Sequence, residues 1–203
     1  MMLIAESHVE ERLIAERQAL GLDAHDEVWD GVYFMPPIAN DEHQHFVSKL
    51  CFAFELVVGV RGLGLVRPGV NVSDRDQDWT ENFRVPDVVV FLNGTRAINR
   101  GAHWHGGPDL AVEIMSKGDR SREKLAFYAA VGTREVLLID RLPWRLELHR
   151  LVDGRMVEAG RSELPASGAI ASEVVPLTFR LVEGPDRPRI EVTGGEAGQQ
   201  WLI

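Results

Sequence analysis

The chain has 203 residues, of which 45% are hydrophobic, enough for one domain with a buried core. Its formal net charge of −9 argues against a protein that holds nucleic acid mainly through a basic surface. That charge does not exclude a nucleic-acid enzyme, because a divalent cation bound to clustered carboxylates reverses their local field. The single cysteine, Cys51, excludes an internal disulfide and a cysteine-rich zinc site. No stretch approaches the roughly 20 apolar residues of a membrane helix, and the N-terminus lacks signal-peptide features, so we expect a cytoplasmic protein with no membrane partner.

The first third of the chain predicts a helix, a hairpin, a longer helix and a strand. Residues 5–20 favour a charged amphipathic helix, and residues 27–35 a β-hairpin whose tight turn is Asp30-Gly31. Asn40 or Asp41 is a suitable N-cap for a buried helix that runs to about Val60. Residues 65–72 follow as a strand.

The middle of the chain predicts the core of a sheet. Residues 83–92 and 109–115 are nearly continuous apolar runs, which are typical of strands covered on both faces. A helix is expected from about Asp119 to Val131, followed by a third buried strand over residues 135–139. This strand–helix–strand order favours a right-handed crossover between parallel strands. The fold class is therefore α/β, with a mixed central sheet flanked by helices.

Further strands complete the expected domain. Residues 143–151 alternate in hydrophobicity and turn back at Asp153-Gly154, which predicts an extra β-hairpin, and residues 174–181 form one more apolar stretch. The composition after Gly184 is rich in proline, glycine and charge and predicts a loose tail. We divide the chain into a helical extension (1–26), a main domain (27–183) and the tail (184–203).

Acidic residues interrupt the apolar core strands. Asp87 follows Pro86 at the start of one strand, Asp109 follows Pro108 at the start of the next, and Glu113 lies in the middle of that second strand. Because an unpaired buried carboxylate costs several kcal/mol, such residues need a cation, a metal or a proton. Oxygen ligands of this kind suit Mg²⁺ or Mn²⁺. Asp87 and Asp109 also have a simpler interpretation as strand-entry residues, whereas Glu113 does not.

The helix after the Glu113 strand adds candidate partners. Lys124 could stabilise developing charge near the two acids, or be an ordinary solvated lysine. Tyr128 lies four residues further on the same helical face, where a packing role is the simpler interpretation. Arg120 and Arg122 could contact phosphate or merely solvate the start of the helix.

Four segments in this order resemble the Uma-type restriction endonuclease family of the PD-(D/E)XK nuclease superfamily. They are VPDVVV at 85–90, PDLAVEIMS at 108–116, EKLAFY at 123–128 and GTREVLLID at 132–140. The upstream segment GVYFMPP at 31–37, followed by Glu42-His43, resembles the entry hairpin and first helix of that family. The resemblance covers about residues 27–182.

The resemblance implies a restriction-endonuclease-like fold and Mg²⁺-dependent cleavage of phosphodiester bonds in nucleic acid, with DNA as the expected substrate. Asp87 matches the first strand acid and Glu113 the second. The superfamily lysine, two residues after the second acid, falls on Met115, which is a departure. The family places a lysine on the following helix instead, and Lys124 matches it. Glu42 matches an auxiliary acid of the first helix.

Two other hypotheses stay open. The acidic charge, the missing strand lysine and the exposed hairpin over residues 144–158 favour a non-catalytic interaction module that keeps the nuclease-like fold. In a weaker alternative, His103 and His105 bind the metal of a hydrolase. An open sheet edge would in either case suggest a homodimer.

Overall fold

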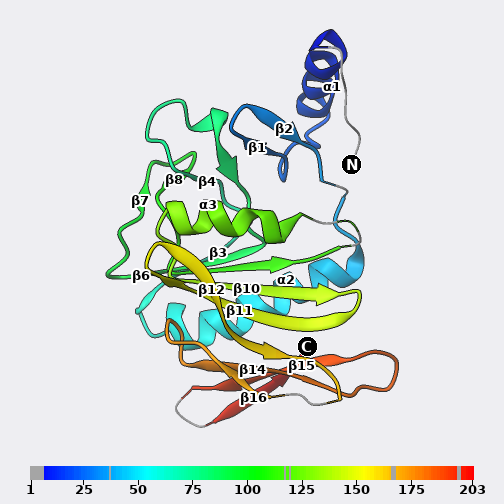
Figure 1. Ribbon diagram of the computed structural model, residues 1–203, viewed down its shortest axis with the longest axis vertical. Coiled ribbons are helices and arrows are strands. Elements are labelled where there is room, and N and C mark those ends of the chain that lie inside the picture. The colour runs from blue at the N-terminus through cyan, green and yellow to red at the C-terminus, as the bar shows by residue number, and fades with distance from the viewer. Residues whose placement is uncertain (1–6, 37, 117, 119, 166–167, 196–197) are drawn as a thin grey trace.

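A six-stranded mixed sheet forms the centre of the molecule in a computed structural model that describes residues 7–36, 38–116, 118, 120–165, 168–195 and 198–203 (Figure 1). The strand order is β12-β11-β10-β9-β6-β3. The strands are β3 (Gly64–Pro68), β6 (Val88–Leu92), β9 (Leu110–Ile114), β10 (Glu135–Arg141), β11 (Trp144–Val152) and β12 (Arg155–Ser162). Among the described residues of this sheet, β9 and β10 are the parallel neighbours, which confirms the parallel pairing expected from the sequence. The other neighbours in this sheet are antiparallel. The tight turns that join β10 to β11 and β11 to β12 require this direction.

Two helices cover opposite faces of this sheet (Figure 1). Helix α2 (Asp41–Phe54) begins at Asn40, whose side chain accepts a hydrogen bond from the His43 N–H, and continues as a π-helical turn, Glu55–Gly59. Its buried face packs on alternate strand residues such as Leu110 and Val112. The connection between β9 and β10 covers the other face as a 3₁₀ turn, Ser121–Lys124, followed by α3 (Leu125–Ala130). This helix is shorter than the one expected, and Asp119, its expected cap, lies outside the described residues.

A second sheet of short strands packs above α3, with the order β2-β1-β5-β4-β8-β7. Its strands are β1 (Glu27–Trp29), β2 (Val32–Phe34), β4 (Val72–Ser73), β5 (Phe83–Arg84), β7 (Ile98–Asn99) and β8 (Trp104–His105), with a 3₁₀ turn at Trp79–Glu81. The β1–β2 hairpin turns at Asp30 and Gly31, both of which have positive φ angles, as a tight turn between twisted strands requires. This confirms the hairpin predicted from the Asp-Gly pair.

The C-terminal residues form a third, antiparallel sheet rather than a loose tail. Its strands are β13 (Ile170–Ala171), β14 (Leu177–Val182), β15 (Arg189–Gly194) and β16 (Gln199–Leu202). Ile190, Val192 and Ile203 are buried in the same core cluster as α2, so the sequence-based prediction was wrong for these residues. The residues of β15 alternate between apolar and polar, but the pattern is short and lies among proline and glycine residues. Its apolar side chains are buried only by tertiary packing.

Helix α1 (Ser7–Ala19) projects from the top of the molecule and is tied to it through Arg17, whose guanidinium pairs with Asp26 (Figure 1). In the described part of the chain, no helix is both long and apolar enough to cross a membrane.

Candidate active site

Strands β6 and β9 bring Asp87 and Glu113 to one cavity. Val88 pairs with Val112 across the two strands, and Asp87 continues this register because its N–H donates to the Val112 carbonyl at 3.1 Å. One Asp87 carboxylate oxygen, Oδ2, accepts a hydrogen bond of 2.6 Å from the Ile114 N–H. Asp87 and Glu113 both line a cavity of about 830 Å³ that also borders the β1–β2 hairpin and α2.

Glu113 lies on the α3 face of β9, while its neighbours Val112 and Ile114 pack on the α2 face. This is the alternation expected for a strand. The Glu113 side chain is buried and satisfied by three donors from the segment that follows. The Tyr128 hydroxyl donates to Oε1, and the Ser121 hydroxyl donates to Oε2 at 3.4 Å. The Lys124 ammonium donates to both oxygens at 3.1 and 2.9 Å.

Lys124 joins Glu113 to a second buried acid, Glu27, at the start of the β1–β2 hairpin. The Lys124 Nζ lies 2.8 Å from Glu27 Oε1. Glu27 is itself held by the Val85 N–H, which donates to Oε1 at 2.8 Å, and by the Trp29 indole, which donates to Oε2 at 2.7 Å. The ammonium therefore lies between two carboxylates that come from different sheets, and it connects the hairpin to the central sheet.

The ionisation of this group follows from one cation shared by two buried acids. Burial raises the pKa of Glu113 to about 7, with Lys124 opposing the shift and Glu27 adding to it. Burial alone would lower the pKa of Lys124, but the carboxylates of Glu113 and Glu27 outweigh it and raise that pKa. Burial and the same two acids raise the pKa of Tyr128 well above its ordinary value. Lys124 thus stays a cation and Tyr128 a neutral hydrogen-bond donor at physiological pH.

Helix α2 contributes His43 to the cavity rather than Glu42. The His43 Nε2 lies 3.0 Å from Asp87 Oδ1. Glu42 points elsewhere: its carboxylate pairs with Arg141 at 2.7 Å and with Arg187 at 2.9 Å, and it is not among the cavity-lining residues. Neighbouring helix residues diverge by about 100°, so only one of the two can face Asp87.

Of the two arginines considered for phosphate contact, one lines the cavity and the other does not. Arg120 lines the cavity, and its guanidinium lies over the rings of Trp29 and Phe34 and pairs with Glu123. Arg122 does not line the cavity, because it is engaged with Asp140 at 2.9 Å and Glu147 at 3.0 Å on β10 and β11. Its pairing fixes the 3₁₀ turn that carries Ser121 and Lys124 to the central sheet.

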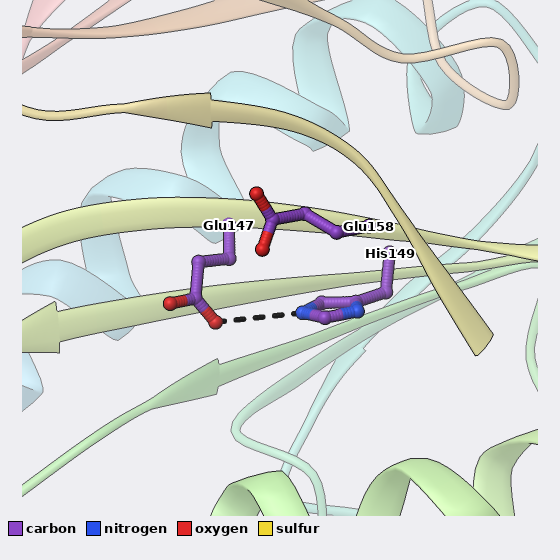
Figure 2. Close-up of side chains that lie close together, drawn as sticks. All are labelled: Glu147, His149 and Glu158. Carbon is purple, nitrogen blue, oxygen red and sulfur yellow. Dashed lines mark hydrogen bonds and ion pairs between the residues drawn. The ribbon is translucent and has the colours of Figure 1, made fainter.

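Glu147, His149 and Glu158 form a second group whose ligand atoms lie close enough to hold one ion (Figure 2). They come from β11 and β12, where His149 pairs with Glu158 across the two strands. The Glu147 carboxylate already accepts hydrogen bonds from Arg122 and lies 2.6 Å from the Nε of Arg145. These arginines balance its charge, so a metal there would have to displace them.

The histidines of the third hypothesis have structural contacts. The His103 ring stacks on Trp79 with centroids 5.0 Å apart, and its Nε2 lies 3.1 Å from the Arg75 carbonyl. Among the described residues, neither His103 nor His105 belongs to a group of three potential metal ligands. Asp109, the other strand-entry acid, accepts a hydrogen bond from the Leu92 N–H at 2.8 Å and pairs with Arg134.

Sequence reasoning missed Glu27, His43 and Ser121. Glu27 opens a short hairpin in which a charged residue is unremarkable, and its partner Lys124 is 97 residues away. A weak signal existed for His43, since it lies one residue from the helix acid that the sequence singled out. Contacts between residues that are far apart in the sequence form only when the sheets pack together.

Comparison with known proteins agrees with this arrangement. A family model, Uma2, described as "Putative restriction endonuclease", matches residues 15–182. Among solved structures, the fold is similar to that of a protein described as a "putative nuclease belonging to DUF820" from Anabaena variabilis ATCC 29413. That match has a TM-score of 0.53 and 16% sequence identity, and it covers 66% of this chain and 75% of the other. No curated protein matches the sequence.

Proposed function

This chain belongs to the Uma2 family of restriction endonuclease relatives, and from that membership and its site we propose that it is a Mg²⁺- or Mn²⁺-dependent endonuclease that hydrolyses phosphodiester bonds in DNA. One observation carries the proposal. Asp87 and Glu113 come from adjacent strands and line one cavity, with Lys124 bonded to Glu113. Paired carboxylates with a cation beside them are a common arrangement for metal-assisted phosphoryl chemistry.

The donor set fits a hard divalent cation. Asp87 and Glu113 offer carboxylate oxygens, the ligands that Mg²⁺ prefers. Lys124 contacts both Glu113 oxygens, so a metal on Glu113 would have to share or replace that contact. A bound Mg²⁺ would polarise a phosphoryl oxygen and lower the pKa of a coordinated water. Asp87 and Glu113 would hold it.

The other residues of the site orient and balance these acids. The Ile114 N–H fixes the Asp87 carboxylate, and Tyr128 and Ser121 fix that of Glu113. If Glu113 held a metal, Glu27 would still pair with Lys124 and favour its charged form. An ammonium held there can stabilise negative charge that develops on a phosphate. His43, 3.0 Å from Asp87, can hold or accept a proton at the edge of the site.

Cleavage and metal binding are tested on the same variants in two assays. Purified protein is incubated with Mg²⁺ or Mn²⁺ and either supercoiled plasmid or single-stranded circular DNA, and metal binding is measured separately by calorimetry. We expect nicking that is lost in Asp87→Asn and Glu113→Gln, together with weaker metal binding in both.

Glu158→Gln is the matched control, because it removes a carboxylate from the Glu147 group and leaves the cavity intact. Metal binding that survives Glu113→Gln but disappears in Glu158→Gln would place the ion on β11 and β12 and contradict the proposal. A stable protein that shows neither cleavage nor metal binding would instead favour the non-catalytic interaction module.

The proposal extends to the setting of the protein. We propose that it acts in the cytoplasm, where Mg²⁺ and DNA are both available, and that it is a homodimer. The edge strand β3 supports the second point, because within the described part of the chain it pairs with β6 on one side only.

A further inference from the structure

An aromatic wall borders the acids of the cavity. Trp29 and Phe34 lie on the two strands of the β1–β2 hairpin with ring centroids 4.2 Å apart, and both line the cavity. Met35, Pro36 and Ile38 extend this wall with apolar surface. The lining of the cavity thus combines two acids, Asp87 and Glu113, with aromatic and other apolar side chains.

The register of the hairpin places this wall beside the acids. Phe34 pairs directly with Glu27 across the two strands, and Trp29 is two residues from Glu27 on the same face. The Trp29 indole donates to Glu27, and Glu27 accepts from Lys124, which also contacts Glu113. A short chain of direct contacts therefore joins the aromatic rings to the proposed metal ligands.

The rings already hold a planar cation. The guanidinium carbon of Arg120 lies 4.8 Å from the Phe34 ring centroid and 5.1 Å from that of Trp29. The Arg120 side chain is 34% exposed, so it can yield its place on the rings to an incoming planar group. A guanidinium can also pair with a phosphate, so an Arg120 moved off the rings suits a nucleotide better than a neutral ligand.

The size and chemistry of the cavity suit one nucleotide. A volume of about 830 Å³ lies within the range of ligand pockets, and it accommodates a base and sugar but not a double helix. In a duplex both faces of each base are stacked, so a base reaches an aromatic wall only after unstacking at a cost of a few kcal/mol. The net charge of −9 offers no compensating attraction for a long duplex.

We infer that this cavity binds one unpaired nucleotide, with its base against Trp29 and Phe34, and that the enzyme's substrate is single-stranded DNA. The inference rests on the proposed function for the cleavage step but makes a separate claim about binding. Stacking on aromatic side chains is the usual way in which proteins hold unpaired bases without strong sequence preference.

The test measures binding without metal, so that no cleavage is needed. Fluorescence anisotropy follows a labelled thymidine oligomer of roughly 12 nucleotides and a blunt duplex of the same length, both in EDTA. We expect the single strand to bind at least about tenfold more tightly than the duplex. Phe34→Leu, which keeps apolar volume but removes the ring, should weaken single-strand binding roughly 5- to 100-fold.

Two variants serve as controls. Phe34→Tyr retains the ring and should bind within about twofold of the wild type, as should Phe52→Leu, which changes an exposed phenylalanine of α2 outside the cavity. Equal affinity of the wild-type protein for duplex and single strand, or unchanged binding in Phe34→Leu, would overturn the inference.

The two proposals fail in different ways. Metal-dependent cleavage of duplex DNA that needs Asp87 and Glu113 but not Phe34 would leave the nuclease and remove the single-strand preference. Phe34-dependent binding of the single strand with no cleavage under Mg²⁺ or Mn²⁺ would support the binding site and remove the hydrolysis.

Discussion

Replacing Lys124 with methionine tests the central electrostatic feature of the site. The Lys124 side chain is 11% exposed and lies between Glu27 and Glu113, whose side chains are 7% and 4% exposed. Methionine fills a similar volume but leaves both carboxylates without their cation. Removing one partner of a buried ion pair costs about 3–5 kcal/mol, and we expect a loss of that size in the free energy of unfolding near pH 8.

The loss should depend on pH, because Glu113 can escape its unpaired charge by taking up a proton. Its pKa is already about 7 with Lys124 present, and removing that cation raises the pKa further. At about pH 5 Glu113 is neutral in both proteins, so the substitution removes the ion pair with Glu27 but leaves no unpaired charge on Glu113. The cost of the substitution should then be roughly half of its value at pH 8.

Urea unfolding followed by circular dichroism measures both quantities. Lys49→Met is the matched control, because Lys49 is an exposed lysine of α2, and its replacement should change stability by less than about 0.5 kcal/mol. A second check is Lys124→Met combined with Glu113→Gln, which should cost less than the sum of the single changes. A loss below about 1 kcal/mol at pH 8, or one that is equal at both pH values, would refute this account of the site.

Three further predictions concern the same site and the core. Because burial raises the pKa of Glu113 above its unfolded value, the folded protein binds more protons than the unfolded chain between about pH 4.5 and 7. The free energy of unfolding should therefore fall by up to about 3 kcal/mol as the pH rises through that range. Glu113→Gln should flatten this slope in urea titrations at several pH values. Tyr128→Phe removes a donor to the buried Glu113 carboxylate and should cost about 1–3 kcal/mol at neutral pH; an unchanged unfolding midpoint would mean that this hydrogen bond contributes little. Ile190→Ala leaves a cavity at a fully buried position of β15 and should lower the free energy of unfolding by about 2–5 kcal/mol. Leu202→Ala, at a side chain that is 54% exposed, should lower it far less. Similar shifts in melting temperature for the two variants would contradict the assigned C-terminal sheet.

Local sequence signals were sufficient for the central strands. The apolar runs that contain Asp87 and Glu113 predicted β6 and β9, and the segment between β9 and β10 predicted a parallel crossover. The pair Asn40-Asp41 predicted the start of α2, and Asn40 is the residue that caps it, because an N-cap acts within one turn of its helix. Each of these features depends on residues that are close in the sequence.

The candidate site was predictable only in part. Glu113 was conspicuous because a carboxylate inside an apolar strand needs a partner, and Lys124 was identified through a family resemblance. Glu27 gave no such signal and His43 only a weak one, since a polar residue at a strand end or on the first turn of a helix is common. Their roles appear once the hairpin and α2 are packed against β9 and β6.

The sequence by itself determined that a buried acid lies in the middle of a core strand, because the cost of burying charge applies wherever that strand is placed. Only the tertiary structure decided which groups satisfy it, and that one ammonium serves two carboxylates from different sheets. It also decided that residues after Gly184 close the core, since Ile190 and Ile203 are buried by elements far away in the chain. Ion pairs and apolar contacts of this kind depend on distance in space, which the order of residues does not specify.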